Sequence, residues 1–416
     1  MKKILKKLIP NLILLGLSTL FILLAAEFVL GLFHVESSGG FRRQKLFCRF
    51  DSVLGWTKIP NYVSRHVTDE YSITETMNSK GLRGPEYSYD KPTGEFRILV
   101  LGDSFAEGRG VEFEEIFSEV MKSDLKASAE LEKSGRSYQV INAGTGGYST
   151  DQELLFFERE GRKYSPDLVI LQFCDNDIWY NARSEHSSGS KPLFRLGEDG
   201  TVSFENVLYP KQSANPPASS PAPASTPGRV QTWLRTRSRV YNLLREGLRN
   251  IPYVSDAAVK LRLLKPKEWS LPDELRVWKK EYDKDTLEAW ELTGALLAKL
   301  QKAVSAEGDE LMVFLVPPWA TVYGKDFKKA RGYYKVGPDL YPEKVAVVLK
   351  TLCEKNGIQF LDPTGNMKET TKTARTALYF KNDGHWTVAG HKVVGGFLSQ
   401  SVRAYESTLD SPGERS

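Results

Sequence analysis

The sequence predicts an α/β protein in which a five-stranded, mainly parallel sheet lies between two layers of helices. Short runs of branched apolar residues alternate along the chain with longer segments whose apolar residues recur every three or four positions. The short runs are typical of strands buried in a parallel sheet, and the longer spacing is typical of helices with one buried face. Because strand and helix alternate, we expect right-handed crossovers and a three-layer α/β/α sandwich.

The expected strands and helices follow from this alternation. The strands are five apolar runs: Arg97 to Leu101, Gln139 to Ile141, Asp167 to Phe173, Leu311 to Val316 and Ile358 to Leu361. The helices are five amphipathic segments: Phe113 to Ala129, Asp151 to Lys163, Asp283 to Ala306, Pro342 to Lys355 and Val388 to Val402. Before the first strand, the lead-in segment (residues 34–96) is rich in Tyr, Thr, Ser and turn residues. It predicts extended chain and short strands, as at Tyr62 to Val67.

An insertion separates the third expected strand from the fourth, because far more residues lie between them than one crossover helix requires. Within it, Ser213 to Gly228 contains five prolines and predicts an extended surface linker. Ser238 to Arg249 and Asp273 to Lys279 have helical spacing. We interpret the insertion, residues 191–282, as a helical cap packed on the α/β domain, with a separate binding module as the alternative.

The N-terminal segment (residues 1–33) predicts a membrane anchor. Leu8 to Ala26 contains 19 residues without a charge, and after Glu27 the apolar run continues to Phe33. The uncharged part covers roughly 28 Å as a helix, close to a bilayer core of about 30 Å. Four lysines precede it, so the positive-inside rule predicts a cytoplasmic N-terminus, with the remaining chain on the other side of the membrane. We expect a retained signal anchor that contacts lipid through residues 8–33; a cleaved signal peptide is the alternative.

The rest of the chain divides into the lead-in segment, the two parts of the α/β domain and a disordered tail. The two parts are residues 97–190 and 283–405, on either side of the insertion, and the tail is residues 406–416.

The composition excludes several classes of protein. Hydrophobic residues make up 41% of the 416 positions and charged residues 26%, which is typical of a globular protein and excludes a polytopic membrane protein. The net charge is only +5, without the basic patch of a nucleic-acid-binding protein. Cys48, Cys174 and Cys353 are far apart and lack C-x-x-C spacing, which excludes a disulfide scaffold and a structural zinc site. We expect no metal, no cofactor and no nucleic-acid partner.

Polar residues cluster in four loops that follow strands or precede the last helix. The loops are Gly102-Asp103-Ser104-Phe105, the glycine loop (residues 142–148, Asn-Ala-Gly-Thr-Gly-Gly-Tyr), Cys174-Asp175-Asn176-Asp177, and the acid–base loop (residues 382–386, Asn-Asp-Gly-His-Trp). Ligands of an open parallel sheet bind at the carboxyl ends of its strands. A hydroxyl, a flexible glycine turn, a side-chain amide and a carboxylate–imidazole pair are therefore expected to meet at one edge.

These four loops, in this order, resemble the SGNH or GDSL family of serine esterases and acyl hydrolases, which have a flavodoxin-like fold. The resemblance covers roughly residues 97–402 without the insertion. Before it, Leu54-Gly55-Trp56 and Asn78 to Gly84 resemble the lead-in of membrane-anchored bacterial members, which implies the bacterial inner membrane. It implies that Ser104 is the nucleophile, with an oxyanion hole formed by its own N–H, the Gly147 N–H and the Asn176 amide. It further implies that His385 is the base; Gly144 is the alternative to Gly147.

His385 is also the histidine that the chemistry favours. A serine needs an imidazole to take its proton and a carboxylate to orient that imidazole. His34 adjoins the apolar N-terminal segment, His66 and His186 have no motif around them, and His391 lies within the last expected helix, where a structural role is expected.

Two positions depart from the family pattern. Cys174 replaces the usual glycine two places before the loop asparagine. Asn382 stands where the family's D-x-x-H places its acid, whereas Asp383 has the D-x-H-W spacing found in polysaccharide O-acetylation proteins. We therefore predict Asp383 as the triad acid, with Asp362 in reserve.

The sequence predicts an esterase that cleaves O-acyl groups of a carbohydrate or another small ester, and we expect the acyl group to be acetyl. An O-acyltransferase acting on an exported polysaccharide and a non-catalytic polysaccharide-binding scaffold are the alternatives. The chain has no G-x-S-x-G elbow, Walker loop or H-E-x-x-H motif. Aromatic residues near the loops are candidates for substrate stacking, although core packing explains most of them equally well: Tyr148, Trp319 and Trp386, with Trp179 and Tyr323 beside them.

Overall fold

The computed structural model describes residues 2–32, 47–68, 70–132, 136–186, 188–205, 208, 238, 240–241, 273–324, 340–374 and 376–409. The chain splits into two compact units. One unit comprises Met1–Lys45 and Gln212–Glu268, and the other comprises Leu46–Lys211 and Trp269–Ser416. The predicted proline-rich linker and most of the helix predicted at Ser238 to Arg249 lie outside the described residues.

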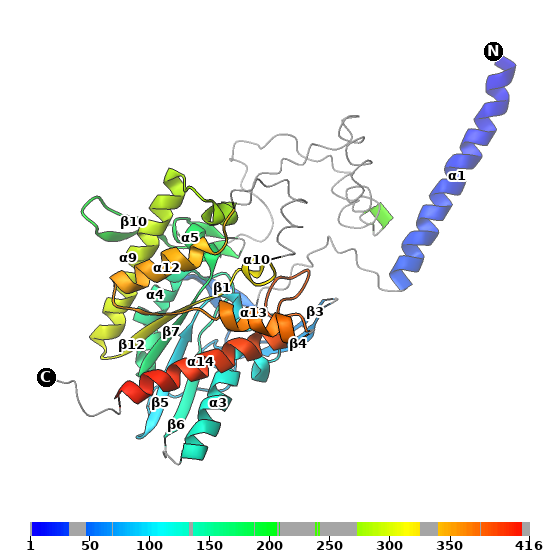
Figure 1. Ribbon diagram of the computed structural model, residues 1–416. Helices are drawn as coiled ribbons and strands as arrows, with labels where there is room; N and C mark the ends of the chain where they lie inside the picture. The colour runs from blue at the N-terminus through cyan, green and yellow to red at the C-terminus, as the bar shows by residue number, and fades with distance from the viewer. Residues whose placement is uncertain are drawn as a thin grey trace. The chain divides into compact units, whose positions relative to one another are not determined.

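The larger unit is built on a five-stranded parallel sheet, as predicted (Figure 1). Its strands are β5 (Glu95–Leu101), β6 (Ser137–Asn142), β7 (Leu168–Phe173), β12 (Glu310–Leu315) and β13 (Gln359–Leu361). Their order across the sheet is β13-β12-β7-β5-β6, and each neighbouring pair is parallel. Each predicted strand is present with its ends shifted by at most two residues, because continuous apolar runs identify fully buried strands.

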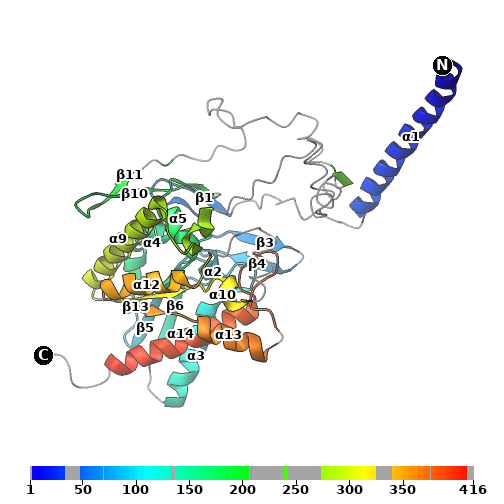
Figure 2. The ribbon, with the colours of Figure 1, turned by 45° about the horizontal axis from the view of Figure 1, so that its top comes forward.

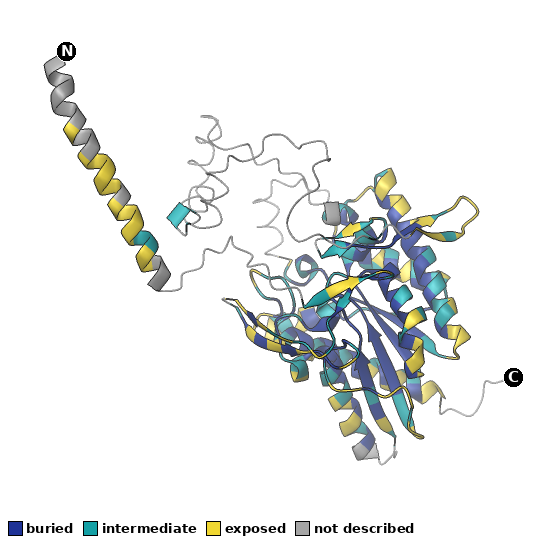
Figure 3. Ribbon diagram, turned by 180° about the vertical axis from the view of Figure 1, so that it is seen from behind, coloured by how far each residue is buried: buried dark blue, intermediate teal, exposed yellow. Residues whose placement is uncertain are grey.

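Helices cover both faces of the sheet (Figure 2). One face packs against α3 (Phe117–Glu132), α13 (Thr364–Thr373) and α14 (Val388–Leu409), and the other against α4 (Thr150–Arg159), α9 (Lys284–Ala306) and α12 (Lys344–Lys355). Successive residues of β5 alternate between the two cores: Ile98 and Val100 face one, Leu99 and Leu101 the other. The strands are accordingly buried while the outer helix faces are exposed (Figure 3). Helix α14 continues to Leu409, so the predicted tail begins later than residue 406.

The lead-in segment, described from residue 47, forms two antiparallel hairpins beside the sheet. β1 (Cys48–Asp51) pairs with β2 (Gly55–Lys58), and β3 (Val63–Val67) pairs with β4 (Ser72–Thr76). Trp56 and Leu82 are buried in the core that α4 and α9 share with the sheet. The described part of the lead-in segment thus belongs to the larger unit.

The remaining elements of the larger unit are short. They are α2 (Ser104–Glu107), α5 (Asp175–Asn181), α10 (Trp319–Val322), the 3₁₀ helices η1 (Phe113–Glu115), η2 (Gly161–Tyr164) and η3 (Asp273–Trp278), and the strands β8 (Glu185–His186), β9 (Gly189–Ser190), β10 (Leu193–Leu196) and β11 (Val202–Glu205). The predicted insertion therefore begins with a hairpin of β10 and β11 rather than with a helix. The helix predicted at Asp273 to Lys279 is a 3₁₀ helix, η3.

The smaller unit contains α1 (Lys2–Leu32), which covers the predicted anchor. Within this unit, Glu27 accepts hydrogen bonds from the Ser238 hydroxyl at 2.9 Å and from the Val240 N–H at 3.1 Å. Among the described residues, no helix combines the length and the hydropathy that crossing a bilayer requires. The membrane-spanning role of residues 8–33 stays a prediction from the sequence.

Candidate active site

Three residues from two distant parts of the chain form a hydrogen-bonded series. Ser104 is the first residue of α2, directly beyond the carboxyl end of β5, and its Oγ lies 2.7 Å from Nε2 of His385. Nδ1 of the same imidazole contacts Oδ1 of Asp383. Because a carboxylate accepts, Nδ1 carries the imidazole proton and Nε2 is left to accept from the serine. His385 and Asp383 keep 17% and 14% of their side chains exposed, so a ligand can reach them.

The turn that presents Ser104 is fixed from two sides. Asp103 caps α2, since its Oδ1 accepts from the Phe105 N–H at 2.8 Å. The side-chain oxygen of Gln172, on the neighbouring strand β7, accepts from the N–H groups of Asp103 at 3.0 Å and Ala106 at 3.1 Å. Burial raises the pKa of Asp103 to about 6. The backbone around the serine is therefore set before any ligand binds.

The glycine loop follows β6, and Asn142 ties it to α2. The Asn142 amide donates to the Ala106 carbonyl at 2.7 Å, and its oxygen accepts from the Gly144 N–H at 2.9 Å. A Cβ at Gly144 would lie 2.4 Å from the Glu107 backbone nitrogen, so only glycine fits there. Gly147 has a φ of +80°, a conformation that favours glycine.

The predicted oxyanion-hole donors lie at the ends of three adjacent strands. Ser104 follows β5, Gly147 follows β6, and Asn176 is the second residue of α5, after β7. The Gly146 N–H donates to Oε2 of Glu107 at 2.7 Å. Within the part of the chain that the structure describes, the Gly147 N–H and the Asn176 side-chain amide donate to no protein acceptor. Both donors are thus available to a ligand.

Asp383 is held by two further side chains. Its Oδ2 accepts from the Tyr71 hydroxyl at 3.1 Å and from Nε of Arg109 at 3.2 Å. Burial raises the pKa of Asp383, but the hydrogen bond and charge of His385 and the charge of Arg109 outweigh it. The pKa therefore lies well below its usual value, and the carboxylate stays ionised.

The lead-in segment also holds the backbone of the acid–base loop. The carboxylate of Glu70, between β3 and β4, accepts from the N–H groups of Lys381 at 2.7 Å and of Asn382 and Asp383 at 3.0 Å. Three successive backbone donors thus converge on one carboxylate. The orientation of Asp383 is therefore fixed through its main chain as well as through its side chain.

A comparison with models of known protein families identifies the family of this chain. The model of the GDSL-like lipase/acylhydrolase family matches residues 100–393. The chain belongs to this family. It is accordingly a serine hydrolase that acts on carboxylic esters, and its α/β fold with a parallel sheet is the one that the resemblance predicts.

Solved structures similar to this esterase share little sequence with it. TesA is 12% identical over 74% of this chain and 98% of its own, with a TM-score of 0.34. A catalytic mutant of Axe2, an acetylxylan esterase from Geobacillus stearothermophilus, is 13% identical over 74% of this chain and 94% of its own, with a TM-score of 0.36. The acetyl xylan esterase AlAXEase is 13% identical over 74% of this chain and 100% of its own, with a TM-score of 0.36. A comparison with curated protein sequences found no match.

The other predicted acids and bases of the esterase have different partners. Asp362 accepts from the Thr364 N–H at 2.9 Å, where α13 begins, so Asp383 rather than the reserve candidate contacts His385. His391 is fully buried, and its Nδ1 accepts from the Phe117 N–H at 3.2 Å. Burial lowers the pKa of His391 to about 3, which keeps this imidazole neutral.

Two of the predicted substrate-binding aromatics are wrong. Trp386 is fully buried, with its ring 4.9 Å from that of Phe105, and therefore belongs to the core. Tyr148 is also buried, and its hydroxyl donates to the Trp56 carbonyl at 2.6 Å. A side chain without exposed surface cannot stack on a sugar. Trp319, in α10, is half-buried, and its role stays a prediction.

Cys174 fits the loop where the family has glycine. It precedes α5 with a φ of −110° and a ψ of 152°, which any residue adopts. Its N–H donates to Oδ2 of Asp177 at 3.0 Å. Burial raises the pKa of the Cys174 thiol well above its usual value, so the thiol is not a nucleophile. Among the described residues, no group of three His, Cys, Asp or Glu side chains is arranged to hold a metal ion.

Several supporting residues were not predicted from the sequence. They are Lys58, Glu70, Tyr71, Glu107, Arg109 and Gln172. Only Gln172 had a local signal, as the one polar residue within an otherwise apolar strand. The others act across long stretches of sequence and show no periodicity.

Proposed function

We propose that this esterase cleaves O-acyl groups, chiefly O-acetyl, from a carbohydrate or another small ester through an acyl-serine intermediate on Ser104. The observation that carries the proposal is the 2.7 Å contact between Ser104 Oγ and His385 Nε2, continued by His385 Nδ1 to Asp383. In this proposal Ser104 is the nucleophile, His385 the general base and Asp383 the orienting acid.

The proposed reaction has two halves. His385 takes the serine proton while Oγ bonds to the ester carbonyl carbon, and the oxyanion accepts from the N–H groups of Ser104 and Gly147 and from the Asn176 amide. The carbon–alkoxy bond then breaks, and the alcohol leaves with the proton from His385. Water next gives a proton to His385 and attacks the acyl carbon, which releases the acid and restores the serine hydroxyl.

The surroundings of the proposed site favour a short acyl group. The ring of Phe105 lies 4.7 Å from that of His385. On the other side, a Cβ placed on Gly147 would lie 2.5 Å from Cε1 of His186. Two rings therefore lie beside the proposed base and beside the proposed oxyanion donor, and we propose that they restrict the acyl group to a short chain such as acetyl.

The test uses the full-length protein in detergent with p-nitrophenyl acetate, butyrate and octanoate and with an acetylated oligosaccharide. We expect the highest kcat/KM with acetate esters, and mass spectrometry should detect acetyl on Ser104. An unchanged rate in Ser104→Ala would overturn the proposal. Supplying an unacetylated oligosaccharide acceptor decides between hydrolysis and transfer. Acetylated sugar that accumulates faster than free acetate would replace the hydrolase with an O-acyltransferase.

We also propose, from the sequence alone, that the catalytic unit lies outside the inner membrane. Four lysines followed by an uncharged apolar run are the pattern that directs export with a cytoplasmic N-terminus. An alkaline phosphatase fused after residue 50 should be active. A reporter that functions only in the cytoplasm should be silent at the same position, and its activity would contradict this location.

A further inference from the structure

The peptide that carries the proposed oxyanion donor is held from outside the family match. The Gly147 N–H belongs to the same peptide unit as the Gly146 carbonyl. That carbonyl accepts from Nε1 of Trp56 at 3.1 Å. Because the N–H and C=O of a trans peptide point in opposite directions, fixing the carbonyl fixes the direction of the N–H. Trp56 thus sets where the Gly147 donor points.

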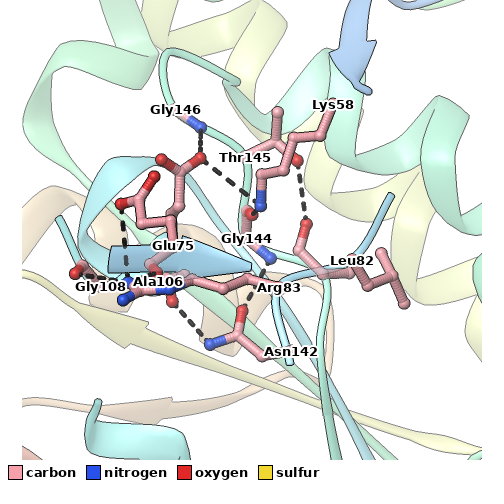
Figure 4. A network of polar contacts seen from close by, with 12 residues as sticks. Lys58, Glu75, Leu82, Arg83, Ala106, Gly108, Asn142, Gly144, Thr145 and Gly146 are labelled. Atoms are coloured by element: carbon pink, nitrogen blue, oxygen red, sulfur yellow. Dashed lines mark hydrogen bonds and ion pairs between the residues drawn. The ribbon is translucent and has the colours of Figure 1, made fainter. Parts of the chain in front are cut away.

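A buried ion pair holds the other side of the glycine loop (Figure 4). Nζ of Lys58 donates to the Gly144 carbonyl and lies 3.5 Å from Oε2 of Glu107. The same Glu107 oxygen accepts from the Gly146 N–H at 2.7 Å. The side chains of Lys58 and Glu107 are only 1% and 4% exposed, so water does not compete for these contacts.

Glu107 also connects the glycine loop to the nucleophile. It is the last residue of α2, the four-residue helix that begins with Ser104. The guanidinium of Arg83, from the lead-in segment, donates to the carbonyls of Glu107 at 2.9 Å and Gly108 at 2.8 Å. The end of α2 is therefore anchored to the same segment as the glycine loop.

Trp56 and Lys58 contact the glycine loop from the same strand, β2. Trp56 and Lys58 are two residues apart on one strand and reach two carbonyls of the same loop, those of Gly146 and Gly144. Residues two apart project on the same face of a strand. Strand β2 thus holds the glycine loop at two of its carbonyls. The strand lies outside the family match, which begins at residue 100.

We infer that Trp56 and Lys58 of the lead-in segment are positioning residues that orient the Gly147 N–H toward the reacting carbonyl oxygen. This inference rests on the proposed function of Ser104 and Gly147. Neither side chain takes part in bond making. Each acts through the glycine loop, so its loss lowers transition-state stabilisation without changing how the ground-state ester binds.

The experiment compares Trp56→Phe and Lys58→Met with Trp290→Phe and Arg97→Met in the full-length protein. Trp290 is a buried tryptophan of α9, an element that makes no hydrogen bond to the glycine loop among the described residues. Arg97 is a fully buried cation at the start of β5, at the opposite end of the strand from Ser104. The controls therefore match the loss of indole volume and of a buried cation, away from the glycine loop.

Three quantities are measured for each variant: kcat and KM on p-nitrophenyl acetate, affinity for a boronic acid that forms a tetrahedral serine adduct, and the free energy of unfolding. We expect Trp56→Phe and Lys58→Met to lose about tenfold in kcat, less than the loss of a direct oxyanion donor, with KM changed less than about twofold. Boronic acid affinity should fall in parallel with kcat. The controls should lose stability but keep kcat.

Each outcome has one meaning. If kcat of folded Trp56→Phe matches that of Trp290→Phe, the positioning role is wrong. If Lys58→Met does not fold, Glu107→Gln is tested in its place. This variant keeps the shape of the side chain and removes the charge that pairs with Lys58, and it should show the same loss of kcat. Ser104→Ala is measured beside them. An active Ser104→Ala would defeat the proposed function, whereas an inactive one beside an unimpaired Trp56→Phe defeats only this inference.

Discussion

The glycine loop and the acid–base loop are both held by the lead-in segment, but by different kinds of contact. Lys58 and Glu107, at the glycine loop, are almost completely buried. At the acid–base loop, Arg109 is 33% exposed, and Glu70 is also partly exposed. Breaking a buried charge pair leaves an uncompensated charge, whereas solvent replaces an exposed partner. Variants of the buried pair at the glycine loop should therefore lose stability together with activity, and variants of the partly exposed Arg109 and Glu70 should lose activity alone.

The largest loss of activity is expected when Ser104 or His385 is substituted. Ser104→Ala and His385→Ala should each lower kcat/KM at least about a thousandfold, because the nucleophile and its base act as one unit. The double variant should be hardly worse than either single one. Steady-state kinetics on p-nitrophenyl acetate and circular dichroism of each variant check this. Additive losses in the double variant would show that the two side chains act independently.

Substitution of the acid should have the next largest effect. Asp383→Asn should lower kcat by about a hundredfold to ten-thousandfold, because an amide in place of the carboxylate no longer stabilises the imidazolium. Asn382→Ala, one residue away with an exposed side chain, should stay within about twofold. The kcat of both variants is measured at pH 7.5. A larger loss in Asn382→Ala would transfer the role of the acid away from Asp383.

Removing the exposed support of the acid should have a smaller effect and should leave the fold intact. Arg109→Gln should lower kcat about threefold to tenfold with little change in the free energy of unfolding. Arg109 helps to hold the pKa of Asp383 low, so without it that carboxylate binds the imidazole proton more strongly. The acidic limb of the kcat/KM profile should therefore move to higher pH. If the acidic limb of the kcat/KM profile does not move, Arg109 has no influence on the acid–base loop.

The smallest effect on activity is expected at His391, behind the acid–base loop, where stability should depend on pH. The pKa of His391 falls from 6.5 to about 3 on folding, so between these values the unfolded chain binds a proton that the folded protein excludes. Wild-type stability relative to His391→Asn should fall by about 2 kcal/mol from pH 7.5 to pH 5. Urea unfolding of both proteins at the two pH values measures this difference. A constant difference would mean that the folded protein binds the proton.

Local patterns predicted the sheet and the polar residues at its edge, and they failed where distant segments meet. Each sheet strand is an apolar run, and Ser104, Gly147 and Asn176 directly follow three of them. The D-x-H-W spacing favoured Asp383 over Asp362, but only the tertiary structure shows which of the two carboxylates contacts His385. Trp386 was misassigned because its place beside His385 in the sequence does not reveal that its ring turns into the core.

The supporting contacts could not be predicted because they join residues far apart in the chain. Trp56 reaches a carbonyl 90 residues away, and Lys58 reaches one 86 residues away. Lys58 has no motif or periodic neighbour that marks it. Trp56 belongs to the Leu54-Gly55-Trp56 stretch, but that stretch does not reveal what the indole contacts. Burial of Lys58 is visible only once β2 lies against the glycine loop.

The order in which the chain is synthesised limits when this esterase can become active. Ser104 and His385 are separated by 281 residues, and Tyr71 and Asp383 by 312. The lead-in segment and the nucleophile leave the ribosome long before their partners exist, and closing such long loops slows folding. A nascent or C-terminally truncated chain therefore lacks an activated serine. The catalytic machinery is therefore assembled only after Asp383 and His385 have been synthesised and have reached Ser104.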